Sequence, residues 1–175
     1  MLTDSLESAS STTGRGSNGN GSWTADTGSW GVDAGVAYLR GADDADNIAT
    51  HDVEAQTQTF EARIGGFGQC GVVVRYQDPL NFVMLYRVNP FFVWNLVEVV
   101  DGNETLVTTV LDADQHDVDV SLTASDHVIA ASVGFTTVTV VRDTAPHGTR
   151  VGLVSRRGER ASECSWYDLR VEGSS

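Results

Sequence analysis

In the stretch Thr57-Gln58-Thr59-Phe60-Glu61-Ala62-Arg63-Ile64, apolar and charged side chains alternate from Phe60 onward. Side chains that are two residues apart in a β-strand project from the same face. The three apolar side chains of this stretch therefore point to one face, and the two charged side chains point to the other. This pattern is typical of an antiparallel strand with one face on the core and the other in solvent. The stretch thus predicts a half-buried β-strand.

The same kind of pattern continues along the rest of the chain. The sequence contains 24 valines and 17 threonines, whose β-branched side chains favour pleated strands, and 18 glycines that interrupt them. No window of about 11 residues has the apolar spacing of a helix, whereas alternation is frequent. The expected strands are 2–6, 30–32, 36–40, 47–51, 57–64, 72–76, 82–88, 96–100, 105–110, 118–122, 127–133, 136–141, 151–155 and 166–171.

These strands follow one another at intervals of about 8 to 12 residues, which is typical of a β-sandwich or a barrel. Two packed sheets are the simplest arrangement, so we expect an all-β chain folded as a two-sheet antiparallel β-sandwich. A chain of 175 residues suits one domain. We expect residues 1–22 to supply an N-terminal strand and a Gly- and Ser-rich loop of that domain, and residues 23–175 to form the sandwich.

The charge of the chain limits its partners. It carries 24 acidic residues against 11 basic ones, all of them arginine, which gives a formal net charge of −13. This sign disfavours nucleic acid and anionic membrane surfaces, because both are themselves negatively charged. The apolar runs are far shorter than the roughly 20 residues that a membrane-spanning helix needs. Residues 1–7 have neither a basic nor an apolar segment, so we expect no secretory signal.

The chain has two cysteines, Cys70 and Cys164, without the CxxC spacing of a metal site. They are compatible with one long-range disulfide and, at least equally, with two reduced, half-buried thiols. The sequence leaves both alternatives open, because a disulfide depends on the distance between the two residues in the fold.

Two segments match the sequence pattern of a cofactor-binding or a catalytic site but lack the structural context that such a site needs. Residues 14–19 match GxGxxG, but no helical pattern follows, so we interpret them as a surface loop. Glu98 and Asp101 are three residues apart and project to opposite faces of a strand, so these two and Glu104 do not form a hydrolytic pair. No nucleophile lies in a recognisable turn. We expect no enzymatic activity, with a polysaccharide hydrolase as a remote alternative.

Two acidic runs, 43–46 and 112–117, contain the carboxylates that calcium prefers. Neither run has the glycine and the terminal glutamate of an EF-hand loop, so solvated loops are the favoured interpretation. The four histidines have no metal-ligand spacing.

Aromatic residues are the most informative candidates for binding. Trp30 and one of the pair Trp166 and Tyr167 alternate with apolar neighbours, so we expect them in the core. A second group follows the bend at Asn89-Pro90 or lies near the start of the expected sandwich, where exposed rings can bury in a protein interface or stack on sugar. We expect contacts to a glycan or a protein partner, with an interface favoured over sugar stacking, through Phe91, Phe92, Trp94 and Trp23.

The order of these features resembles the concanavalin A-like lectin/glucanase jelly roll, a laminin-G-like domain. The resemblance covers nearly the whole chain. The segments that carry it are 23–32, 36–39, 60–64, 71–76, 78–82, the hairpin at 101–102, 138–140, 150–153 and 166–171. It implies a jelly-roll sandwich of lectin type. The compact two-acid strand motif of the family's glucanases is not reproduced in residues 98–104, which argues against hydrolysis.

The first 32 residues are more narrowly similar to lectin-like domains in virion proteins of tailed viruses, with those of actinobacterial or archaeal hosts closest. This resemblance rests on residues 2–6, 9, 11–14, 23–24 and 28–32. It implies a virion surface protein, either a capsid decoration or a tail component, that is made in the host cytoplasm and docks on other virion proteins. It also implies homo-oligomers or repeated copies on the particle and attachment to host-surface glycans. The alternative is a carbohydrate-binding module of a secreted protein.

Some members of the superfamily bind calcium on the back of the sandwich. They use an acidic residue of the final strand together with groups near the N-terminus. The matching positions here are Asp168 and Asp4, so the resemblance implies that these two carboxylates are ligands of a calcium ion. Calcium needs further oxygen ligands, and a strand-edge charge is an equally good interpretation of Asp168.

Overall fold

The computed structural model describes residues 23–88, 93–112, 117–158 and 160–174 of the chain. These residues form fourteen β-strands and no helix, so the all-β prediction is confirmed. Since they contain no helix at all, none of the described segments is a helix able to cross a membrane. The predicted strand 2–6 lies outside the described residues, and the assignment of residues 1–22 to the same domain stays a prediction.

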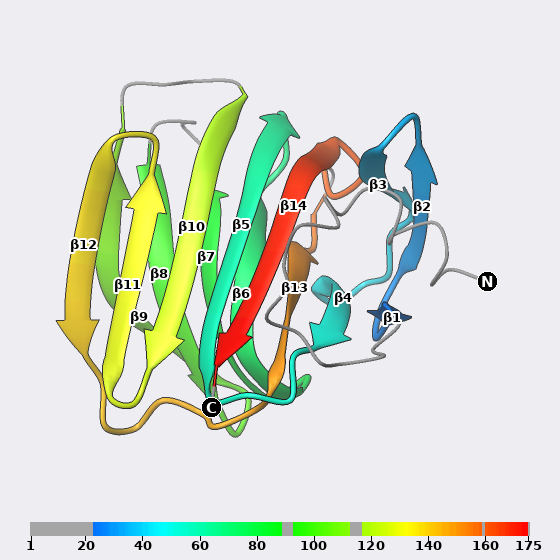
Figure 1. Ribbon diagram of the computed structural model, residues 1–175. Helices are drawn as coiled ribbons and strands as arrows, with labels where there is room; N and C mark the ends of the chain where they lie inside the picture. Colours follow the sequence, from blue (N-terminus) through cyan, green and yellow to red (C-terminus); the bar gives the residue numbers. More distant parts are fainter. Residues whose placement is uncertain (1–22, 89–92, 113–116, 159, 175) are drawn as a thin grey trace.

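The strands form two antiparallel sheets of seven that pack face to face (Figure 1). The back sheet has the order β1 (Thr24–Ala25), β4 (Asn47–Asp52), β13 (Arg150–Ser155), β6 (Cys70–Asp78), β7 (Asn81–Val88), β8 (Val93–Val100) and β9 (Asn103–Leu111). The front sheet has the order β12 (Thr136–Val141), β11 (Val128–Val133), β10 (Val118–Ser125), β5 (Thr57–Gly66), β14 (Cys164–Ser174), β3 (Val36–Gly41) and β2 (Ser29–Asp33). The predicted two-sheet antiparallel β-sandwich is confirmed.

Strand β5 lies in the middle of the front sheet, between β10 and β14. Its residue Phe60 is paired with Leu122 of β10 and with Val171 of β14, and all three side chains are buried. Ala62 and Ile64 are buried on the same face of β5. The alternation in the sequence therefore identified the core face of the central strand correctly.

All four tryptophans are buried between the sheets. Trp30 and Trp166 pack against each other with ring centroids 5.2 Å apart, which confirms Trp30 as a core residue and identifies Trp166 as the core member of the pair Trp166 and Tyr167. Trp23 is 1% exposed beside Phe60, and Trp94 is 0% exposed beneath the Arg87 guanidinium. The expectation that Trp23 and Trp94 contact a glycan or a partner is therefore wrong, because both rings are buried in the core. Phe91 and Phe92 lie outside the described residues.

The hairpin between β8 and β9 has the turn that the sequence predicted. Asp101 and Gly102 both have positive φ angles, of 50° and 78°, and Val100 pairs with Asn103 around them. Two successive residues with positive φ match the type I′ turn of a two-residue hairpin, in which Asp-Gly is a favoured pair.

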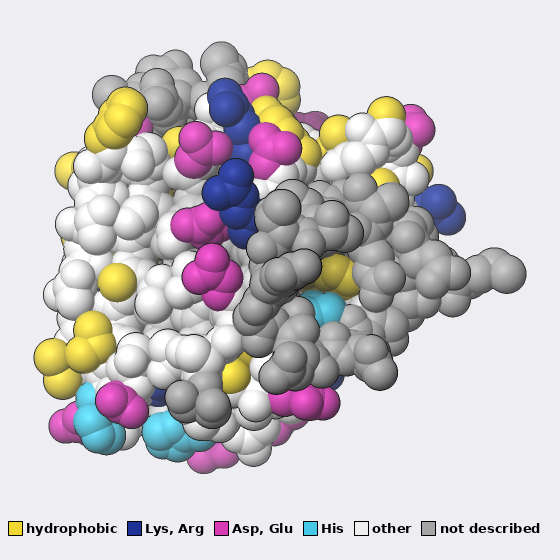
Figure 2. Space-filling model, viewed as in Figure 1, with side chains coloured by type: hydrophobic (Ala, Val, Ile, Leu, Met, Phe, Trp, Pro, Cys, Tyr) yellow, Lys and Arg dark blue, Asp and Glu magenta, His cyan; other side chains and the backbone are white. Residues whose placement is uncertain are grey.

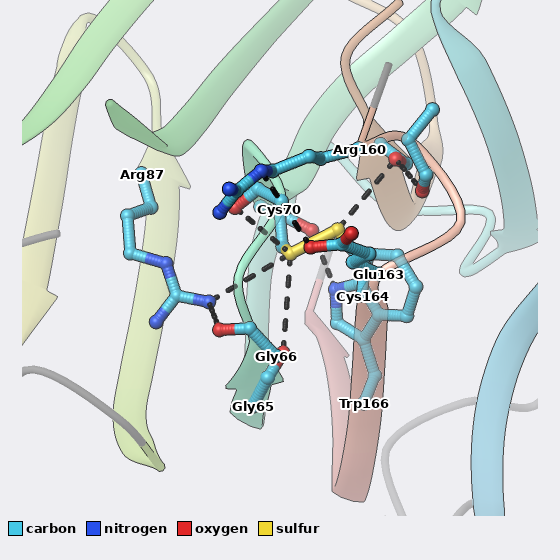
Figure 3. Close-up of a disulfide and its surroundings, with 12 residues drawn as sticks. Gly65, Gly66, Cys70, Arg87, Arg160, Glu163, Cys164 and Trp166 are labelled. Carbon is cyan, nitrogen blue, oxygen red and sulfur yellow. Dashed lines mark hydrogen bonds and ion pairs between the residues drawn. A yellow bond between two sulfur atoms is a disulfide. The ribbon is translucent and has the colours of Figure 1, made fainter. Parts of the chain in front are cut away.

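A disulfide between Cys70 and Cys164 joins the two sheets, with Cα atoms 5.6 Å apart (Figure 3). Cys70 begins β6 in the back sheet, and Cys164 begins β14 in the front sheet. Beside the bridge, the Trp166 indole donates a hydrogen bond of 2.9 Å to the Gly71 carbonyl. The structure thus decides between the two alternatives that the sequence left open, and neither cysteine is free.

The chain passes very close to itself at this disulfide. A Cβ atom at Gly66 would overlap the carbonyl oxygen of Glu163, and Gly66 has a φ of +93°. Only glycine accommodates both conditions without strain. Gly66 therefore allows the end of β5 to lie against the segment that carries Cys164.

Candidate functional site

The outer face of the front sheet carries a polar groove of about 560 Å³ over β5, β10, β11 and β14. Figure 2 shows arginine and acidic side chains gathered on this face, beside a mostly uncharged surface over β11 and β12. The groove is lined by Glu61, Ala62, Arg63, Asp119, Val120, Ser121, Ser132, Gly134, Asp168 and Arg170. We call it the front groove.

Strand alternation places most of these side chains in the groove. On β5 the outward residues are Glu61 and Arg63, which the sequence had assigned to the solvent face. They pair with Ser121 and Asp119 of β10, respectively, so four polar side chains meet on two adjacent strands. Sequence reasoning predicted the outward face of β5. It did not identify the groove, because nothing local indicates that β10 and β14 flank β5.

Asp168 reaches the groove through a β-bulge. Tyr167 pairs with Arg63 and Arg170 pairs with Glu61, so two residues of β14 lie opposite the single residue Ala62 of β5. Asp168 is the extra residue, and its φ is +54°. Leu169, which follows it, is fully buried, so the strand regains its core face at once. Bulges commonly re-aim one side chain in this way beside functional sites.

Opposite charges lie close together along the groove. The Arg63 guanidinium is 3.9 Å from the Asp119 carboxylate, and its Cζ atom lies 5.9 Å from the centre of the Tyr167 ring. The charge of Asp119 raises the pKa of Arg63. Burial, followed by a hydrogen bond to Asp117, raises the pKa of Tyr167. At neutral pH Arg63 is therefore charged, and the Tyr167 phenol keeps its proton.

Three charged groups of the groove remain available to a ligand. None of the ion pairs within 4.0 Å among the described residues involves Glu61, Asp168 or Arg170. Two carboxylates and one guanidinium can therefore accept and donate hydrogen bonds without first breaking a salt bridge. The lining as a whole has three carboxylates and two guanidinium groups, so it is slightly acidic.

The acidic residues that were rejected as a hydrolytic pair are occupied elsewhere. The Glu98 carboxylate is almost fully buried and accepts hydrogen bonds of 3.1 and 3.3 Å from Arg142 and of 2.8 Å from the Thr144 hydroxyl. Glu104 is exposed and accepts bonds of 2.8 and 3.2 Å from Arg156. Glu98 and Glu104 are thus each held by a different arginine, and Asp101 lies in the turn of the β8–β9 hairpin.

The described residues contain no cluster of metal-ligating side chains. Among them no three His, Cys, Asp or Glu side chains are grouped as a metal site needs. Asp168 lies in the front groove with two arginines, and Asp4 lies outside the described residues. The acidic run 43–46 ties loops together instead, because Asp43 accepts from the Gly28 amide and Asp46 accepts from the Arg157 amide.

Comparison with known proteins places the chain by its fold. No protein-family model and no curated protein sequence matches it. Among solved structures, the carbohydrate-binding module CBM66 from Bacillus subtilis matches with a TM-score of 0.67 at 13% identity, over 94% of this chain and 98% of that chain. The CBM2 module of the evolved Dit of Lactobacillus casei BL23 phage J-1 matches with a TM-score of 0.59 at 12% identity, over 95% and 92%.

A third similar structure is the exoplasmic/lumenal domain of VIP36 in a Ca²⁺/Man3GlcNAc-bound form. It matches with a TM-score of 0.60 at 10% identity, over 87% of this chain and 85% of that chain. At such low identities these likenesses show the fold alone. They confirm the concanavalin A-like jelly-roll sandwich that the sequence resembled.

Proposed function

We propose that this chain is a non-catalytic carbohydrate-binding domain and that the front groove holds an uncharged glycan. The observation that carries the proposal is a set of three charged side chains, Glu61, Asp168 and Arg170, that form no ion pair with any described residue and lie in one groove on the outer face of a sheet. The fold supports it, since two of the similar structures are named as carbohydrate-binding modules and one contains a bound mannose-type glycan.

Sugar hydroxyl groups suit this lining. Each hydroxyl donates one hydrogen bond and accepts others. Carboxylates only accept hydrogen bonds and guanidinium groups only donate them. Asp168 can therefore accept from one hydroxyl of a sugar ring while Arg170 donates to a neighbouring hydroxyl. An anionic sugar fits less well, because the groove is slightly acidic and the chain carries a net charge of −13.

A glycan array followed by calorimetry with the best glycan tests this proposal. We expect Arg170→Ala and Asp168→Asn each to weaken binding about tenfold or more, because a hydrogen bond to a charged group contributes roughly 1.5–3 kcal/mol. Arg40→Ala is the matched control. It removes an exposed arginine of β3 outside the groove and should leave the affinity unchanged. A blank array, or equal losses in all three variants, would contradict the proposal.

The same titration tests the role of calcium, and a separate assay tests catalysis. Calcium remains a prediction from the family resemblance, so binding is compared in calcium and in EDTA. Equal affinities would remove calcium from the proposal. The absence of catalysis is tested by incubating the protein with the bound glycan and assaying reducing sugar. Its release, lost in Glu98→Gln or in Glu104→Gln, would establish the hydrolase alternative instead.

We further propose that the domain works on the surface of a virus particle, as a capsid decoration or a tail component that docks on other virion proteins. The support is the sequence resemblance at the N-terminus and the similarity to a module of a phage Dit. The inter-sheet disulfide fits an extracellular particle, because disulfides persist in oxidising surroundings. Detecting the protein in purified particles by mass spectrometry tests this setting, whereas finding it as part of a secreted protein would support the alternative.

A further inference from the structure

Exposed apolar side chains gather along one side of the sandwich. The described residues contain seven large hydrophobic side chains that are exposed. Five of these lie on β9, β11, β12 or the turn between β11 and β12, and they are Leu106, Leu111, Val128, Phe135 and Val141. Both sheets end on this side, the back sheet with β9 and the front sheet with β12 (Figure 1).

Among the strands that the structure describes, β12 forms one edge of the front sheet. Its six residues, Thr136-Thr137-Val138-Thr139-Val140-Val141, include no charge, no proline and no glycine, and every one is β-branched. Natural edge strands usually carry charges, prolines or bulges that prevent pairing with another chain. β12 pairs with β11 in unbroken register and has none of these features. It is therefore suited to accept another strand.

The hydrogen-bond pattern identifies which backbone groups face outward. The Arg142 amide donates to the His127 carbonyl, so these two residues form a hydrogen-bonded pair of the β11–β12 ladder. Such pairs alternate with non-hydrogen-bonded ones along an antiparallel ladder. The amides and carbonyls of Thr137, Thr139 and Val141 therefore point away from β11, toward the free edge.

We propose that two copies of this chain associate through β12, antiparallel and around a two-fold axis at Thr139. In this register Thr139 lies opposite the partner's Thr139, and Thr137 lies opposite the partner's Val141. The three outward-facing residues of each strand then exchange about six backbone hydrogen bonds. The two front sheets become one continuous sheet of fourteen strands.

The side chains agree with this register. On the outer face, where Thr137 and Thr139 are exposed, uncharged β-branched side chains meet one another. On the inner face, half-buried Val138 lies opposite the partner's Val140, which extends the apolar layer from one copy to the next. A register shifted by one residue would put threonine against the valine layer.

Charge also favours a second copy as the occupant. Two molecules of net charge −13 repel each other, and this repulsion is smallest where they meet through an uncharged strip. Across β12 no pair of like charges is brought opposite. The interface is isologous, so the same surface of β12 must be complementary to itself, and the uncharged β12 meets this requirement.

One consequence rests on the proposed function. The two-fold axis is perpendicular to the joined sheet. The outer faces of the two front sheets therefore lie on the same side of the dimer. The two front grooves would then face the same surface and bind a repeated glycan with avidity. The interface itself does not depend on what the grooves bind.

Light scattering coupled to size exclusion on the full chain tests the interface. We expect a dimer for the wild type and monomers for Thr139→Asp and Thr139→Lys, because like charges would face each other across the axis. An equimolar mixture of these two variants should recover the dimer, since the charges then attract. Thr105→Lys, which places the same charge on the β9 edge, is the control and should remain dimeric.

Thermal melts of each variant show that it is folded. A monomeric wild type, a dimer that survives both Thr139 variants, or dissociation only with Thr105→Lys would overturn the proposal. Capture of another protein's strand by a monomeric wild type would do the same. Binding of a soluble monovalent glycan should be equal in wild type and Thr139→Asp, so failure of the interface and failure of glycan binding are distinguishable.

Discussion

At the residue scale, Gln58 shows how one polar side chain fixes a buried junction. It is fully buried on β5, and its amide nitrogen donates to the carbonyls of Ala55 and Gly148, each at 2.7 Å. Its amide oxygen accepts from the Arg75 amide at 2.7 Å. One side chain thus satisfies three backbone groups from three separate segments. In the sequence it is an ordinary polar residue of an alternating strand.

We predict that Gln58→Leu lowers the free energy of unfolding by about 3 kcal/mol or more, because three buried backbone groups lose their partners. Gln56→Leu is the control, since Gln56 is exposed and its one side-chain hydrogen bond among the described residues goes to the His147 carbonyl. That change should stay within about 0.5 kcal/mol. Urea denaturation measures both, and equal effects of the two substitutions would contradict the assignment.

At the scale of elements, β14 combines two tasks in a single strand. It pairs with β5 along almost its whole length, and it adds one residue to the outer face at the bulge. The shift between Tyr167 and Arg170 is one residue, so removing Asp168 would restore an unbroken register. Leu169 would then lie opposite Ala62, and both already face the core.

Deletion of Asp168 is therefore expected to leave the free energy of unfolding within about 1 kcal/mol, because the deletion also removes a strained positive φ. Glycan binding should be lost with the carboxylate. The matched deletion of Ala130 falls in β11, whose register is regular on both sides. It should cost about 3 kcal/mol or more, since following side chains change faces. Urea denaturation measures the stability of both deletion variants, and calorimetry measures their glycan binding. Equal destabilisation by the two deletions would contradict the assignment of Asp168 as the extra residue of the bulge.

At the scale of the whole molecule, two sheets are held together by their apolar faces and by one covalent link. The core cluster runs between the sheets and includes all four tryptophans. The disulfide joins β6 to β14 across this core and closes a loop whose ends are 94 positions apart. Most charged residues that the structure describes lie on the outside, and Arg75, Arg87 and Glu98 are the buried exceptions.

Replacing both cysteines, as Cys70→Ala with Cys164→Ala, should lower the free energy of unfolding by about 4–5 kcal/mol. A loop of this length loses that much closure entropy in the unfolded state. Denaturant unfolding of the variant and of the wild type in reductant should give the same midpoint. A wild type whose midpoint is insensitive to reductant would contradict the prediction.

The sequence by itself determined what depends on neighbouring residues. The alternation from Phe60 to Ile64 gave the core face of β5, and the Asp101-Gly102 pair gave the hairpin of β8 and β9. Such features follow from the two-residue period of a strand and from the φ preferences of single residues. The sequence also predicted two packed sheets, because many short strands without helices have few other ways to bury apolar surface.

Tertiary structure alone decided what depends on residues far apart. It buried Trp23 and Trp94, brought the two cysteines close enough to form a disulfide and placed Asp168 at a bulge opposite β5. It also brought β5, β10 and β14 side by side, which creates the front groove from residues more than one hundred positions apart. The physical reason is that strand order and register are set by packing of the whole core, which local alternation does not encode.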